Sequence, residues 1–367
     1  MTESRLHQVA QLGQSAWIDF LSRELVRSGE LARMADDDAI VGVTSNPTIF
    51  QQALATGDRY DEQLAELAGS DMTTKELFVA LGSVDVSEAC DVLAGVHAAT
   101  GGVDGYVSFE VDPTLAYDAE ATIAEAARLH EQIDKPNLYV KIPATRPGLT
   151  AIEEMISRGR SINVTLIFSL QRYQEVVEAY LRGLERLVAA GGDPANVNSV
   201  ASFFVSRVDS EADARLDALG GHDELKGKLA IANARLAYHH YLEEFSSERW
   251  KFLASKGARP QRCLWASTST KNPEYRDVLY VEELIGPNTV NTLPEPTIRA
   301  FQDHGDPSAR LAHGADDAAK LLEALADAGV DYGDITDVLE REGVEKFVAS
   351  FVDLLDGIAA KRAALTG

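Results

Sequence analysis

The chain of 367 residues contains only two cysteines, Cys90 and Cys263, which form no CxxC pair and no cluster with metal-ligand spacing. This argues against a disulfide framework and against a zinc site. No run reaches the roughly 18 apolar residues of a membrane-spanning helix. The opening residues, MTESRLHQVAQLG, lack the apolar segment of a signal peptide. We therefore expect a soluble, cytoplasmic protein.

Basic residues are scarce relative to acidic ones. The chain has 34 lysines and arginines against 58 aspartates and glutamates, which gives a formal net charge of −24. Such a surface repels nucleic acids and anionic membranes, so we expect neither as a partner. The charge carries no information about the fold.

The motifs of several common enzyme classes are also missing. The chain has no GxSxG, no HExxH and no Walker loop. GGVDG at 101–105 precedes a predicted strand, which is the wrong context for a dinucleotide-binding loop. None of the eight histidines stands late in a predicted strand; His239 and His240, for example, fall within a predicted helix.

The chain does contain eight short apolar runs with helical segments between them. Helical spacing of apolar residues is clear at 121–133, 170–190 and 224–255. Alternating strands and helices predict a parallel sheet covered by helices, and eight repeats favour closure into a (β/α)8 TIM barrel of the α/β class. A doubly wound open sheet is the alternative. The predicted strands are 15–20, 39–46, 104–111, 137–144, 161–168, 199–208, 262–268 and 289–293.

Two regions contain more residues than a minimal (β/α)8 barrel requires. Residues 47–103 include a long helical pattern at 73–100, and residues 314–365 read as helices that would close over the barrel. We find no linker rich in proline, glycine or serine, no internal repeat and no low-complexity tract. The simplest organisation is one barrel domain spanning 1–367.

Polar residues fall on one face of most predicted strands. Strand side chains alternate in direction, so each of these runs has an apolar face for the helices and a partly polar face for the barrel interior. Most of the polar residues also stand late in their runs, toward the end where barrel active sites lie. The residues expected to meet in one pocket are Asp19, Asn46, Glu110, Lys141, Asn163 and Thr165.

Each polar residue taken alone has a structural explanation. An ion pair accounts for Lys141, turn chemistry for Asn46 before a proline, and helix capping for Asp19. Arg207 and Lys271 are compatible with solvated surface charges. The large number of these polar residues argues against explaining each one separately. Buried polar groups cost free energy unless they pair with one another or with a ligand.

A buried lysine near carboxylates suits imine chemistry. Burial disfavours an ammonium and leaves an amine that can attack a ketone. The resulting iminium withdraws electrons and lets the neighbouring C–C bond break, so no metal or organic cofactor is required. One carboxylate removes a hydroxyl proton, and another moves protons through water during imine formation.

Five segments resemble those of the transaldolase family, in the family's order. Two are long signatures, and the similarity runs from about Asp19 to about Asn272. The chain resembles the longer bacterial branch, and the family fold is a (β/α)8 barrel. The segments are GVTSNPTIF (42–50), SFEVDP (108–113), LYVKIPATRPGLTAIEEM (138–155), INVTLIFS (162–169) and SFFVSR (202–207).

The resemblance implies roles for the catalytic residues and for two of the binding residues. Lys141 would form the imine, and Asp19 would be the acid/base for the C4 hydroxyl. Glu110, with Thr165, would hold the catalytic water. The covalent dihydroxyacetone unit would have its hydroxyls bound by Asn46 and Asn163.

The remaining binding residues face the rest of the substrate. Ser202 and Arg207 would hold it, with Arg207 on its phosphate. The family has an arginine as its second phosphate contact, whereas STSTKNP (267–273) offers Lys271 here. Lysine gives a point charge rather than a fork. Met155 stands where the family signature usually has leucine, a change we assign to packing.

The function implied is transfer of a dihydroxyacetone unit between sugar phosphates. The expected reactants are sedoheptulose 7-phosphate with glyceraldehyde 3-phosphate, giving erythrose 4-phosphate and fructose 6-phosphate in the pentose phosphate pathway. One alternative is a related Schiff-base fructose 6-phosphate aldolase that releases free dihydroxyacetone. Another is a non-catalytic sugar-phosphate binding barrel. We expect a monomer or a homodimer.

Overall fold

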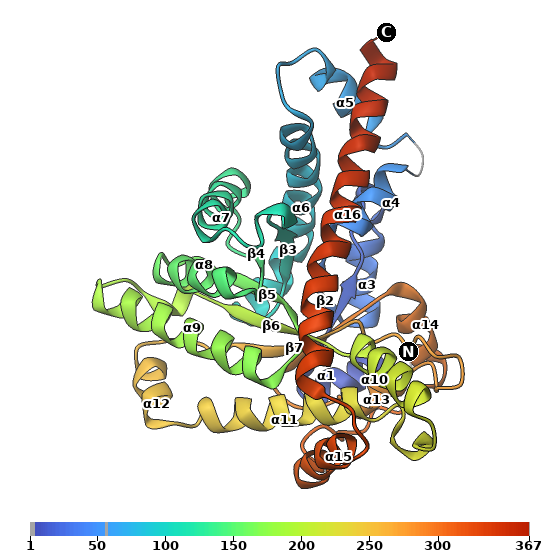
Figure 1. Ribbon diagram of the computed structural model, residues 1–367. Coiled ribbons are helices and arrows are strands. Elements are labelled where there is room, and N and C mark those ends of the chain that lie inside the picture. The colour runs from blue at the N-terminus through green and yellow to red at the C-terminus, as the bar shows by residue number, and fades with distance from the viewer. Residues whose placement is uncertain (1–3, 56–57, 367) are drawn as a thin grey trace.

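A computed structural model describes residues 4–55 and 58–366. Its eight strands form a closed barrel in chain order, each parallel to its neighbours, and β8 pairs with β1. This confirms the predicted (β/α)8 barrel. Figure 1 shows the strands at the centre with helices around them. The strands are β1 Gln14–Asp19, β2 Ile40–Thr44, β3 Tyr106–Glu110, β4 Leu138–Pro143, β5 Ile162–Ile167, β6 Ser199–Phe204, β7 Arg262–Ala266 and β8 Thr289–Leu293.

The helices follow the predicted alternation. Around the barrel and beyond it lie α1 Arg5–Gln11, α2 Arg23–Arg27, α3 Glu30–Asp38, α4 Pro47–Ala55, α5 Asp61–Ala68, α6 Thr74–Ala99, α7 Ala119–Ile133, α8 Arg146–Ser157, α9 Leu170–Ala189, α10 Ser206–Leu219, α11 Leu229–Glu244, α12 Glu248–Ser255, α13 Leu279–Glu283, α14 Glu295–His304, α15 Ala315–Asp327 and α16 Tyr332–Thr366. Within the described ranges, no helix is both long and apolar enough to cross a membrane.

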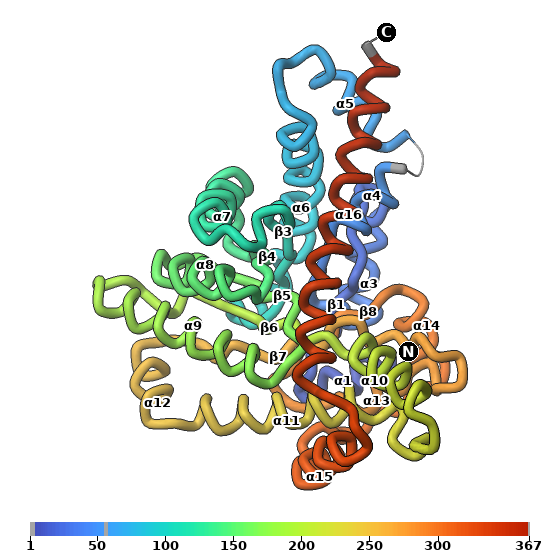
Figure 2. Tube along the Cα trace, in the orientation of Figure 1, coloured from blue at the N-terminus to red at the C-terminus, as the bar shows by residue number. Residues whose placement is uncertain are grey.

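Two predicted boundaries were wrong. The sixth strand ends at Phe204 rather than at residue 208, because α10 begins at Ser206. The helix predicted over 224–255 is broken between α11 and α12. Ser247 adopts an extended backbone there and its side chain accepts from the Trp250 amide, which starts a new helix. Figure 2 shows the chain turning between these two helices.

Aromatic side chains fill the amino-terminal half of the barrel. Trp17 stacks on Tyr139 with ring centroids 6.1 Å apart, and Tyr139 stacks on Tyr106 at 4.1 Å. Gly42 on β2 makes room for this layer, because a Cβ there would lie 2.4 Å from the Trp17 ring. The barrel is thus a packed core at this depth.

A buried ion pair lies at the same end as the aromatic layer. Arg262 at the start of β7 contacts Asp104 with a nitrogen–oxygen distance of 2.9 Å, and both side chains are almost fully buried. Ser15 Oγ and Trp17 Nε1 also donate to Asp104. These bonds satisfy the carboxylate inside the barrel, as a buried charge requires.

The long C-terminal helix α16 runs beside α4, α5 and α6 and reaches the carboxyl ends of the strands, where it contacts β5 and α10 (Figures 1 and 2). A Cβ on Gly343 would lie 3.2 Å from Leu166 and 3.3 Å from Phe168, so the helix approaches the end of β5 closely. Of the two C-terminal helices, only α16 covers this end. Helix α15 packs on the outer helix α11 instead.

Candidate active site

A cavity of about 340 Å³ opens at the carboxyl ends of the strands. All of the predicted site residues except Glu110 and Asn163 line it. Asp19, Lys141, Thr165 and Ser202 reach it from strands, whereas Asn46, Arg207 and Lys271 come from segments that follow strands. The lining residues are Asp19, Thr44, Asn46, Thr48, Ile49, Gln52, Lys141, Thr165, Ser202, Phe204, Arg207, Ala266, Ser267, Ser269, Lys271, Thr292, Pro294 and Phe347.

Lys141 projects from β4 into this cavity and is only 5% exposed. Its Nζ donates to the backbone oxygen of Ser45 at 2.9 Å and lies 3.5 Å from Oε2 of Glu110. The lysine is therefore held by one backbone carbonyl and one loosely placed carboxylate. That arrangement leaves its nitrogen next to space that a ligand can enter.

Glu110 lies behind Lys141 rather than in the cavity wall. It borders a small void together with the aromatic rings of Phe50, Phe78 and Phe109. Burial raises the pKa of the Glu110 carboxyl to about 7, and the Lys141 charge opposes part of this rise. Its Oε2 has no hydrogen-bond partner in the described part of the chain. A carboxyl with this pKa can both give and take a proton near neutral pH.

Asp19 stands at the end of β1 on the opposite side of the cavity. Burial raises its pKa, whereas Lys141 and a hydrogen bond from Thr44 act against the rise. Thr44 Oγ1 donates to Asp19 Oδ1 at 2.8 Å and lies 2.6 Å from Thr292 Oγ1. The hydroxyl fixes one carboxylate oxygen, and the other can face a substrate.

The two threonines beside Asp19 were not among the predicted site residues. Thr44 and Asn46 stand two residues apart in the predicted strand 39–46, so the alternation rule could have included Thr44, although β2 itself ends at Thr44. Thr292 is the fourth residue of β8, and the same rule applied to TVNTL would have placed either Thr292 or Asn291 inside. Only the register with β1, where Thr292 pairs with Trp17, decides between them.

Asn163 is fully buried below the cavity floor. Its Nδ2 donates to Ser108 Oγ at 3.0 Å, and its Oδ1 accepts from Ser202 Oγ at 2.7 Å. In this arrangement the amide orients Ser202, which does line the cavity. Thr165, two residues further along β5, has a buried Oγ1 without a hydrogen-bond partner among the residues described. The next residue, Leu166, has a φ of 60° where the β5–β6 register shifts, and such bulges are frequent beside active sites.

Two cations stand at the far side of the cavity. Arg207 is the second residue of α10, and its guanidinium lies 5.4 Å from the centre of the Phe204 ring. Lys271 lies at the cavity rim and contacts Ser269 Oγ at 2.8 Å. Over residues 4–55 and 58–366, neither cation forms an ion pair, and Arg207 Nη1 is buried without a hydrogen-bond partner.

Burial lowers the pKa of Arg207, and partial burial together with the Arg207 charge lowers the pKa of Lys271. The effect of the Arg207 charge on the pKa of Lys271 agrees with their positions in the lining of the same cavity. An anionic group placed between them would relieve the cost of burying these charges. In a protein with a net charge of −24, two unpaired cations in one cavity indicate an anion site.

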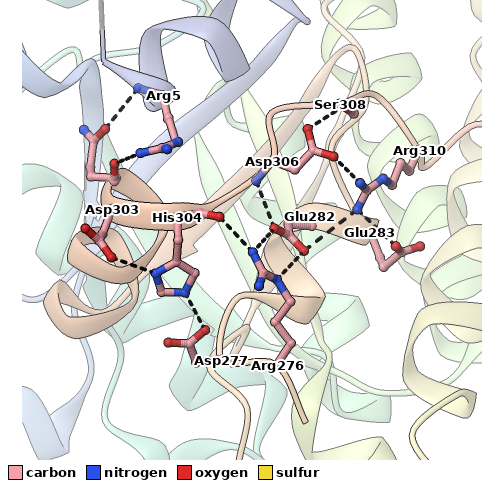
Figure 3. Close-up of polar contacts among 11 residues, drawn as sticks. Arg5, Arg276, Asp277, Glu282, Glu283, Asp303, His304, Asp306, Ser308 and Arg310 are labelled. Carbon is pink, nitrogen blue, oxygen red and sulfur yellow. Dashed lines mark hydrogen bonds and ion pairs between the residues drawn. The ribbon is translucent and has the colours of Figure 1, made fainter.

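The connection between β7 and β8, which includes Lys271, is also held by a polar cluster around Arg276 (Figure 3). Arg276 makes two hydrogen bonds of 3.0 Å to Glu282 and also donates to the backbone oxygen of His304 at 2.8 Å. The His304 ring contacts Asp277 at 2.8 Å, and this carboxylate raises the pKa of the imidazole. The cluster ties the β7–β8 connection to the end of α14.

Phe347 lines the cavity, although no pattern in the sequence predicted it as a site residue. It comes from α16, about 200 residues after Lys141 along the chain, and its ring centre lies 5.9 Å from Lys141 Nζ. The apolar pattern around Phe347 predicted only that this residue belongs to a helix. Residues Thr48 and Gln52 of α4 and Ser267 and Ser269 after β7 were likewise missed, because they lie on helices and loops rather than on strand faces.

Comparison with known proteins agrees with this geometry. Residues 16–358 match the family model described as transaldolase/fructose-6-phosphate aldolase. The chain is 52% identical over 357 residues to a transaldolase of Frankia alni, covering 96% of each chain. It is 53% identical to a transaldolase of Acidothermus cellulolyticus, covering 95% of this chain and 94% of the other. With a transaldolase of Thermobifida fusca it shares 51% identity, covering 99% of this chain and all of the other. The chain therefore belongs to the transaldolase/fructose-6-phosphate aldolase family.

Proposed function

We propose that this protein is a transaldolase that carries a dihydroxyacetone unit between sugar phosphates as a Schiff base on Lys141. The observation that carries the proposal is the position of Lys141 in the cavity, with Glu110 and Asp19 on either side and two unpaired cations at the far end. The full-length similarity to proteins named transaldolase supports it.

The first step is imine formation. The Lys141 amine adds to the ketone carbon of the donor sugar, and loss of water from the carbinolamine gives an iminium. Glu110, with a pKa of about 7, serves both as the acid that protonates the departing hydroxyl and as the base that accepts the amine proton. The unpaired oxygens of Glu110 and Thr165 suit a shared water that carries these protons.

The second step is cleavage of the C3–C4 bond. Asp19 takes the proton from the C4 hydroxyl, the bond electrons move to the iminium nitrogen, and the aldose phosphate leaves. A dihydroxyacetone enamine remains on Lys141. The acceptor aldehyde then adds by the reverse steps, and Asp19 returns its proton to the new hydroxyl. The hydrogen bond from Thr44 holds the carboxylate for this transfer.

Arg207 and Lys271 are proposed to bind the substrate phosphate, while Asn46 and Ser202 bind hydroxyls. Asn163 contributes by orienting Ser202. The proposed reactants are sedoheptulose 7-phosphate with glyceraldehyde 3-phosphate, and fructose 6-phosphate with erythrose 4-phosphate. The scheme requires no cofactor. A monomeric or homodimeric state and a cytoplasmic location stay predictions, which analytical ultracentrifugation and cell fractionation check.

Two measurements test the proposal. Borohydride reduction in the presence of fructose 6-phosphate should attach a dihydroxyacetone unit to Lys141, identified by peptide mass spectrometry, and Lys141→Ala should fold normally but lose both adduct and turnover. Product analysis with and without an acceptor aldehyde separates transfer from release of free dihydroxyacetone. Trapping at another lysine would contradict the assignment of Lys141. Binding of sugar phosphates without any adduct or turnover would support the non-catalytic barrel instead.

A further inference from the structure

The Phe347 ring covers the reactive nitrogen of the cavity. Its centre lies 5.9 Å from Lys141 Nζ, it lines the cavity, and it is only 6% exposed. No other aromatic ring in the described residues is within cation–π range of this lysine. The ring comes from α16 and is therefore an addition to the barrel rather than part of a strand face.

Helix α16 is seated firmly enough to hold that ring in place. Gly343, one turn before Phe347, allows the helix to approach Leu166 at the end of β5. Ser350, almost one turn after Phe347, shares a hydrogen bond of 2.7 Å with Thr48 on α4. Contacts on both sides of Phe347 thus fix the distance between α16 and the cavity.

A transferase of this kind must protect its intermediate. Once the aldose phosphate has left, the enamine on Lys141 waits for an acceptor. If the enamine carbon takes a proton instead, an iminium forms; water then adds to its carbon, the C–N bond breaks, and free dihydroxyacetone and the lysine amine are released. The enzyme would then act as an aldolase. Hydrolysis of an iminium also releases the transfer product, so the outcome depends on whether water protonates the enamine carbon before an acceptor aldehyde adds.

We propose that Phe347 is a specificity-determining residue that keeps water from the enamine carbon and so favours transfer over release. The inference rests on the proposed transaldolase function. The apolar ring displaces water beside the nitrogen, so water that could protonate the enamine is kept away. This effect needs the ring to stay over Lys141.

The test compares three variants with the wild-type protein. Fructose 6-phosphate is supplied with and without erythrose 4-phosphate, and the formation of sedoheptulose 7-phosphate and of free dihydroxyacetone is followed. Phe347→Ala should raise the ratio of release to transfer by about tenfold or more, because it uncovers the enamine. Phe347→Leu keeps an apolar cover and should change the ratio by less than about threefold. Leu354→Ala truncates a buried residue of the same helix outside the cavity and should leave the ratio unchanged.

The outcomes separate the two proposals. If the wild-type protein forms neither adduct nor transfer product, the proposed function and the role of Phe347 are both wrong. If it transfers normally and Phe347→Ala leaves the ratio unchanged, only the role of Phe347 is wrong. An equal rise in Leu354→Ala would assign the effect to loosening of α16 rather than to the ring. Circular dichroism confirms that each variant is folded, and Phe347→Leu supplies the comparison if Phe347→Ala is not.

Discussion

Lys141 Nζ lies 3.5 Å from Glu110 Oε2, yet its hydrogen bond goes to the carbonyl oxygen of Ser45. The Glu110 carboxylate is thus near enough to exchange a proton with Lys141 without being held by a hydrogen bond from it. Burial beside aromatic rings raises the pKa of Glu110 to about 7, which suits proton exchange near neutral pH. A tighter ion pair would instead hold both groups in their charged forms.

Glu110→Gln should slow adduct formation and remove its pH dependence near pH 7. The expected loss is roughly 10²- to 10⁴-fold, the usual contribution of an acid–base group. Borohydride trapping after timed mixing with fructose 6-phosphate, from pH 5.5 to 8.5, measures it. A variant that keeps the wild-type pH profile would show that another group titrates.

The same carboxyl should affect stability in a defined direction. Its pKa rises from 4.5 to about 7 on folding, so the folded protein binds the proton more tightly. This contribution to the free energy of unfolding is fully present below pH 4.5 and is lost as the pH rises to about 7. The difference in unfolding free energy between Glu110→Gln and the wild type should therefore grow in favour of the variant across this range in urea titrations. A constant difference would contradict the raised pKa.

Asp19→Asn should still form the adduct but cleave it slowly. The amide keeps the hydrogen bond with Thr44 within reach but cannot take the hydroxyl proton. Single-turnover experiments with fructose 6-phosphate should show normal trapping and release of glyceraldehyde 3-phosphate slowed by roughly 10²- to 10⁴-fold. Normal release with slow trapping would reverse the roles of Asp19 and Glu110.

The strands could be predicted from the sequence because buried parallel strands are marked by Val, Ile and Phe runs. The interior face also followed from alternation, which correctly brought Asp19, Lys141 and Thr165 to one cavity. Depth along the barrel could not be predicted in this way. Asn163 lies below the cavity floor because strand registers, set by tertiary pairing, decide how far each residue reaches.

The site residues that come from outside the strands also could not be predicted from local sequence patterns. Phe347 reaches Lys141 only through the path of α16 across the barrel, which no local spacing encodes. The break between α11 and α12 was missed for another reason: the helical pattern is continuous, and a single capping side chain, Ser247, overrides it.

Gly42→Ala should destabilise the protein by about 1–3 kcal/mol, the usual cost of overpacking a core. The added Cβ would lie 2.4 Å from the Trp17 ring, and the ring is held by its bond to Asp104. Gly95→Ala is the matched control, because it lies in α6 with nothing within 4 Å of its Cβ position. That variant should gain about 0.4–1 kcal/mol. Urea unfolding measures both, and equal stability of the two variants would contradict the packing argument.

Arg207→Ala should lose far more efficiency on phosphorylated substrates than on free sugars. Its Nη1 is buried without a hydrogen-bond partner, the side chain has no ion-pair partner among the described residues, and it lines the cavity with Lys271. A hydrogen bond to a charged group contributes about 1.5–3 kcal/mol, so the ratio of kcat/KM for fructose 6-phosphate to that for fructose should fall roughly 10- to 150-fold. Lys271→Ala should lower the same ratio less, because an ammonium at the exposed rim lacks the bidentate geometry of arginine. Lys320→Ala, an exposed lysine of α15, is the control for a simple change in net charge and should leave the ratio unchanged. Equal losses on both substrates would mean that Arg207 supports the fold around Phe204 rather than the phosphate.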